Sequence, residues 1–173
     1  YFSKEIELKK ETLYNCKMVQ AQDGVSVESD TLGALLYPLE GDTFALDMVI
    51  KPERYHEFGI ALHVDKELET GYFLRMNPKN QLVAWDMWPR GEQGRYQWQI
   101  KGDVPYQIET ARKLPKAEEY RVHIIKEKDI CVVYINDEIV LSTRMYNHKD
   151  GYAGIYVVQG DVKLIQYKEK RSE

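Results

Sequence analysis

Apolar side chains recur at every second position along many short segments of this chain, and this period constrains its fold more than any other feature. In residues 43–51 (TFALDMVIK), every second residue is apolar, and the positions between them include Asp47 and Lys51. A period of two puts alternate side chains on opposite faces of a β-strand, whereas a helix needs a period of about 3.6 residues. The expected strands are 43–51, 55–64, 71–77, 80–88, 119–127, 129–136, 138–146, 152–159 and 161–168, with weaker candidates at 5–9, 12–19, 25–28 and 34–39.

Turn-forming residues separate these segments and favour antiparallel connections. The turn signals are NPKN at 77–80, NDE at 136–138, HKDG at 148–151 and QGD at 159–161. The least patterned stretch, 89–118, is expected to contain a short strand near PYQIET and one short turn at 116–119, because long structureless loops are uncommon in compact domains. A chain of 173 residues suits one domain. We therefore expect an all-β fold, a single antiparallel two-sheet β-sandwich of jelly-roll type over residues 1–173.

The alternation also predicts the hydrophobic core. In each strand the bulky apolar residues share one phase, and burying that phase removes apolar surface from water. The expected core residues are Phe44, Leu46, Met48, Phe58, Ile60, Leu62, Leu74, Met76, Val133, Ile135, Ile155 and Val157.

Composition excludes several classes of function. The formal net charge is −4, and the basic stripe of a nucleic-acid-binding protein is missing. No apolar run approaches the length of a membrane span, which is about 18 residues or more, so we expect neither a nucleic-acid nor a membrane partner. The N-terminus, YFSKEIELKK, has no apolar signal core, and the chain is therefore mature, cytoplasmic or cut from something longer.

The sequence shows no familiar arrangement of catalytic or metal-binding residues. Its two cysteines and four histidines lack zinc-ligand spacing, and no serine lies in a GxSxG elbow. We therefore expect no catalytic residue, no metal ligand set and no cofactor. A Cys16–Cys131 disulfide stays undecided. A structural calcium ion also stays open, because acids cluster near turns at Asp65, Glu67, Glu69 and Asp161.

Polar and planar side chains share one phase of the strands expected between residues 55 and 88. Arg75 and Asp86 offer charge-assisted hydrogen bonds to vicinal hydroxyls, and Trp88 offers an aromatic plate for the apolar face of a sugar. Short connections make these strands neighbours. The candidate ligand-binding residues are Glu57, His63, Arg75, Asp86, Trp88 and Tyr156. The alternative is a solvated sheet face crossed by an Arg75–Asp86 or Arg75–Glu57 ion pair.

The sequence allows more than one interpretation of two further features, Asp86 and the loop at 89–98. Asp86 lies in WDMW, where the tryptophans would raise the pKa of a catalytic carboxyl by desolvation; the simpler interpretation is an aspartate paired with an arginine. The loop PRGEQGRYQW, residues 89–98, would form a rim over a ligand or pack against a catalytic domain, or else Tyr96 and Trp98 would fold back over the core.

Residues 129–168, DICVVYINDEIVLSTRMYNHKDGYAGIYVVQGDVKLIQYK, resemble the end of the C-terminal β-sandwich of glycoside hydrolase family 32, the fructosidases, invertases and levanases. Val132 to Asp137 matches a family strand reading like VEVFVNDG, and Ser142 to Tyr146 matches one reading like TSRIYP. Residues 58–88 are similar to the hairpin reading like GLVFRAD…GYYLRID, which also occurs in levanase-associated fructan-binding modules. The resemblance covers residues 43–168 and implies a concanavalin-like jelly roll.

The resemblance implies an ancillary role rather than an activity. The family's catalytic acids lie in a propeller, in motifs resembling WMNDPNG, RDP and EC, and none of these occurs in this sequence. A non-catalytic module of a glycoside hydrolase is implied, with a fructose-type or related glycan as ligand, a catalytic glycosidase domain as a possible second partner, and an extracellular or bacterial cell-surface location. The alternatives are a sandwich-fold enzyme acting on glycans and a purely structural module that positions a propeller.

Overall fold

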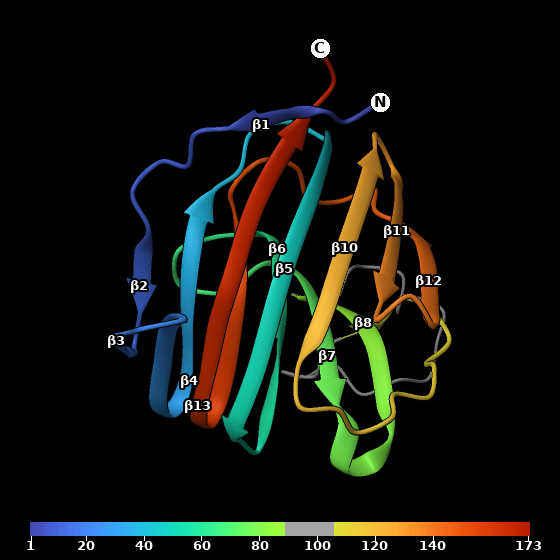
Figure 1. The fold of residues 1–173 in the computed structure, drawn as a ribbon. Helices are drawn as coiled ribbons and strands as arrows, with labels where there is room; N and C mark the ends of the chain where they lie inside the picture. The colour runs from blue at the N-terminus through green and yellow to red at the C-terminus, as the bar shows by residue number, and fades with distance from the viewer. Residues whose placement is uncertain (89–105) are drawn as a thin grey trace.

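The computed structural model describes residues 1–88 and 106–173, and the regular structure there is β-strand apart from one 3-10 turn, η1 (Pro78–Asn80) (Figure 1). The strands are β1 (Lys4–Ile6), β2 (Thr12–Tyr14), β3 (Lys17–Ala21), β4 (Gly24–Pro38), β5 (Thr43–Arg54), β6 (Glu57–Val64), β7 (Gly71–Asn77), β8 (Leu82–Trp88), β9 (Tyr106–Gln107), β10 (Tyr120–Glu127), β11 (Ile130–Ile135), β12 (Ile139–Arg144) and β13 (Tyr152–Arg171). The described residues contain no helix with the length and apolarity of a membrane span.

The strands form one curled antiparallel sheet that folds over into two packed layers. Its order is β12-β11-β10-β5-β13-β6-β7-β8-β9, with β4 also paired to β13. The first half of β13 pairs with β6 and the second half with β5, so this strand takes part in both layers. In Figure 1, β5, β10 and the C-terminal half of β13 lie in front, and β6, β7 and β8 lie behind them. The expected β-sandwich is therefore confirmed.

From the sequence we expected breaks within two long strands, and the structure shows both strands to be continuous. The QGD segment at 159–161 is a β-bulge inside β13 rather than a turn, with Gln159 at a φ of 50° and the register shifting between Val158 and Gly160. A bulge bends a strand, and strands that change layer use such bends. β4 likewise runs unbroken from Gly24 to Pro38 across the gap left between the weak candidates 25–28 and 34–39.

The core matches the alternation in the sequence. All twelve expected core residues are at most 1% exposed, and they belong to one cluster that both layers share. Trp85, Tyr72 and Tyr120 add the largest buried side chains. Both cysteines are free thiols, so the possible disulfide is absent, and burial raises the pKa of Cys131 to about 12.

The expected connections are only partly confirmed. Asn136 and Asp137, with φ values of 51° and 56°, are the central residues of the turn closed by Glu138 N donating to Ile135 O, within the three-residue connection between β11 and β12. β9 lies within PYQIET, as expected. Residues 77–80 form η1 rather than a simple turn, and residues 116–119 contain no helical turn.

Candidate functional site

The three strands that carry most of the candidate site are neighbours. β7 pairs with β6 on one side and β8 on the other, and Arg75 lies between Gly59 and Ala84. Phe73 lies opposite Asp86 in the same ladder. Because residues on one face of an antiparallel ladder meet across the strands, the polar phase forms a single surface on the outer face of the β6–β8 layer.

Arg75 and Asp86 form the ion pair at the centre of this surface. Arg75 Nε donates to Asp86 Oδ2 at 2.8 Å, and Nη2 lies 3.5 Å from Oδ1. Their side chains are 26% and 7% exposed, so the pair is half-shielded from water. The hydrogen bond with Asp86 raises the pKa of Arg75. The guanidinium therefore stays charged and is held in a fixed orientation.

Glu57 is held against Tyr156 at the edge of the same surface. Tyr156 Oη donates to Glu57 Oε2 at 3.2 Å, and the tyrosine is 2% exposed. Burial raises the pKa of Glu57. Gly59 makes room for the tyrosine, because a Cβ at Gly59 would lie 2.9 Å from its ring and 1.9 Å from the backbone oxygen of Leu74.

A small hollow of about 190 Å³ lies beside the Arg75–Asp86 pair; Asp86 lines it, whereas Arg75 does not. Its lining is Leu32, Glu57, Leu68, Phe73, Asp86, Trp88, Tyr156 and Val158. The sequence analysis missed Leu68, which comes from the β6–β7 loop and lies 4% exposed against the outer face at a φ of 57°. Asp65 holds that loop by accepting hydrogen bonds from Thr70. A loop leucine has no periodic signal, so only the folded chain shows that it forms a wall.

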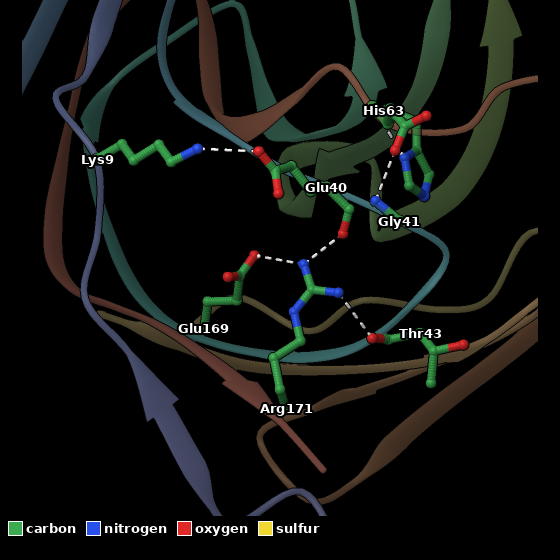
Figure 2. A network of polar contacts seen from close by, with 8 residues as sticks. Lys9, Glu40, Gly41, Thr43, His63, Glu169 and Arg171 are labelled. Carbon is green, nitrogen blue, oxygen red and sulfur yellow. Dashed lines mark hydrogen bonds and ion pairs between the residues drawn. The ribbon is translucent and has the colours of Figure 1, made fainter. Parts of the chain in front are cut away.

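The structure does not bring His63 to this surface, so its assignment to the site is wrong. A register shift in the β6–β13 ladder leaves His63 unpaired between Leu62 and Val64, at a φ of 53°. Its ring turns into the sandwich, 5.6 Å from the ring of Phe44, and is 3% exposed. Its Nδ1 lies 2.8 Å from the backbone oxygen of Asp150 (Figure 2).

The residues around His63 form a polar network at one end of the sandwich. Arg171 donates to the backbone oxygens of Thr43 and Glu40 and pairs with Glu169, while Lys9 reaches the Glu40 carboxylate at 2.9 Å (Figure 2). These contacts join the N-terminal segment to the end of β13 and the start of β5, which is a structural role.

Among the described residues, no group of three or more His, Cys, Asp and Glu side chains is arranged to hold a metal ion. Two of the four acids that suggested calcium contact other residues of the chain: Asp65 accepts from Thr70 within its own loop, and Asp161 lies 3.8 Å from Arg54. The candidate rim at 89–98 lies outside the described residues.

Comparison with protein-family models gives no match, and comparison with curated proteins gives none. Solved structures do match. The carbohydrate-binding module CBM66 from Bacillus subtilis aligns with a TM-score of 0.77 at 16% identity, covering 95% of this chain and 97% of the module. The Man3GlcNAc- and Ca²⁺-bound lumenal domain of VIP36 has a TM-score of 0.64 at 10% identity, covering 94% and 84%.

Domain 4 of AbnA, an extracellular arabinanase of Geobacillus stearothermophilus solved with arabinotriose, has a TM-score of 0.55 at 10% identity, covering 95% of this chain and 84% of that domain. At such identities the likeness is one of fold. The fold is similar to the β-sandwiches of a carbohydrate-binding module and of a domain of a glycoside hydrolase, and the likeness does not single out the family-32 C-terminal type.

Proposed function

We propose that this chain is a non-catalytic carbohydrate-binding module that holds one sugar ring in the hollow on the outer face of β6, β7 and β8. The observation that carries the proposal is Asp86, which is fixed by Arg75 and lines the hollow beside the aromatic side chains of Phe73 and Trp88. A fixed guanidinium and carboxylate present donors and acceptors to neighbouring hydroxyls. Trp88 and Phe73 offer apolar surface to the C–H face of a ring.

We take the ligand to be a terminal fructose-type ring or a short fructan. The hollow of about 190 Å³ is small, which suits one ring better than a long chain. The sequence resemblance to fructan-binding sandwiches supports the same ligand class, and the named fold neighbours include a carbohydrate-binding module and two domains solved with bound oligosaccharides. A catalytic glycosidase domain as partner and an extracellular or cell-surface location belong to the same proposal.

A glycan-active enzyme is the second candidate, because one pocket carboxyl has a raised pKa. Burial raises the pKa of Glu57, and Asp86 lies in the same hollow; glycosidases place a carboxyl of raised pKa near a second carboxyl. Arg75 lies against both oxygens of Asp86, however, which lowers its value as a nucleophile or base. We expect no hydrolysis of sucrose, levan or inulin, and turnover abolished by Glu57→Gln would establish the enzyme instead.

Calorimetric titration against fructose, levan and inulin, with xylan as the control glycan, tests the binding proposal. Arg75→Lys keeps the charge but loses the planar fork, and we expect a ten- to hundredfold loss of affinity, equivalent to about 1.5–3 kcal/mol. Trp88→Ala should weaken binding while leaving the thermal midpoint close to that of the wild type, because Trp88 is only partly buried.

The matched control is Arg54→Ala, since Arg54 is an exposed arginine outside the hollow; its affinity should equal that of the wild type. The proposal fails if no glycan binds the wild type, or if Arg75→Lys and Trp88→Ala bind as tightly as the control.

A further inference from the structure

A second concave surface lies on the opposite side of the sandwich, on the outer face of β13, β5, β10 and β11. Its volume is about 670 Å³. The lining is Asp47, Met48, Val49, Arg121, Val122, His123, Ile125, Tyr134, Asp137 and Gln166. None of these residues lines the hollow beside the Arg75–Asp86 pair, so the two surfaces are independent.

The strand register arranges one row of side chains straight across this groove. Lys168 lies opposite Asp47, Asp47 opposite His123, and His123 opposite Tyr134. Strands are about 4.8 Å apart, so the lining from β13 to β11 spans roughly 14 Å. The groove is therefore elongated across the strands, unlike the hollow on the other face.

The polar groups of the groove are held in place by one another. Asp47 accepts a hydrogen bond from His123 Nδ1 and pairs with Lys170 at 3.1 Å. These two partners lower the pKa of Asp47 against the opposing effect of its burial. Arg121 lies 3.8 Å from Asp137. Each charge in the groove thus has an opposite charge beside it, which leaves oriented donors and acceptors without a strong field of either sign.

Tyr134 supplies an exposed aromatic surface at one end of the row. It is 36% exposed, and its ring centroid lies 6.1 Å from that of His123. Apolar side chains continue the platform, because Val132 lies beside Ile125 and Val140 lies opposite Tyr134. An aromatic ring next to fixed polar groups suits a ligand that has both C–H faces and hydroxyls.

From this geometry we infer that the groove binds the interior of an uncharged polysaccharide chain, running across β13, β5, β10 and β11. The paired charges favour a neutral ligand, and the elongated shape favours several consecutive sugar units over a chain end. The inference extends the proposed carbohydrate-binding role to a second surface. It does not require the hollow beside the Arg75–Asp86 pair to bind anything. A protein with both surfaces would hold a chain end and a chain interior at once, which increases avidity.

Backbone amide NMR of the ¹⁵N-labelled chain tests the inference, because it reports each surface separately. The probes are inulin-type fructo-oligosaccharides and arabino-oligosaccharides. We expect at least one probe to shift amides of residues 45–49, 121–125 and 132–136 in a saturable manner. The same shifts should persist in Arg75→Lys, which alters only the other surface.

Variants of Tyr134 identify the contact. Tyr134→Ala should lower the affinity of the groove for the probe by about fivefold or more. Tyr134→Phe, which keeps the ring, should retain the affinity of the wild type. Tyr146→Ala is the matched control, because Tyr146 is a 60% exposed tyrosine outside the groove. The inference is overturned if no probe shifts the groove amides, whether or not the amides around Arg75 respond. It is also overturned if Tyr134→Ala binds like the control.

Discussion

The buried imidazole of His63 should make the stability of this sandwich depend on pH. Its Nδ1 lies 2.8 Å from the Asp150 carbonyl oxygen and donates to it, and its Nε2 is buried with no hydrogen-bond partner in the described part of the chain. Protonation at Nε2 would place a positive charge in the core, near Lys126. Burial therefore lowers the pKa of His63 from its ordinary value of 6.5 to about 4.

The sign and size of the effect follow from linkage. Between pH 6.5 and about 4 the unfolded chain binds a proton at His63 that the folded chain does not. The contribution of neutral His63 to the unfolding free energy is fully present above pH 6.5 and is lost progressively as the pH falls to about 4. The pKa values differ by about 2.5, which corresponds to a loss of about 3 kcal/mol.

Urea unfolding at pH 7.5 and pH 4 measures this loss, with His63→Asn as the perturbation. Asparagine tolerates a positive φ but does not titrate here, so the variant removes the effect and preserves the backbone. We expect the unfolding free energy of the wild type to fall by about 3 kcal/mol more than that of His63→Asn. His56→Asn, at an exposed histidine, should behave like the wild type. Equal losses in wild type and His63→Asn would refute the reasoning.

Two further substitutions test the packing. Leu74→Ala should cost about 2–5 kcal/mol of unfolding free energy, because Leu74 is fully buried in the shared core; an unchanged midpoint in chemical denaturation would contradict this. Lys126→Met should stabilise the fold by about 1–3 kcal/mol at neutral pH, because Lys126 is 0% exposed, its Nζ has no partner among the described residues, and burial lowers its pKa. That gain should shrink as the pH approaches the ordinary lysine pKa of 10.5, where the unfolded chain also loses the proton; a less stable variant at neutral pH would contradict this interpretation.

The alternation was sufficient to predict the core and most of the candidate site, because side-chain parity within a regular strand leaves little freedom. Arg75, Asp86 and Trp88 lie on the face that their phase required. Parity fails at bulges, where one extra residue reverses the phase. His63 turns inward for this reason, and the next residue, Val64, joins the outer apolar cluster. The same effect hid the continuity of β13 at Gln159.

The hollow itself results from the cross-strand register, which no single strand contains. Ala34, Tyr156, Gly59, Arg75 and Ala84 form one row across β4, β13, β6, β7 and β8. Large and small side chains alternate along this row, so each large side chain has space on both sides. Tyr156 occupies the space beside Gly59, and Arg75 can turn toward Asp86 because Ala84 leaves its flank open. A shift of one residue in any ladder would replace small neighbours with bulky ones, and the pocket therefore depends on the fold as much as on its polar residues.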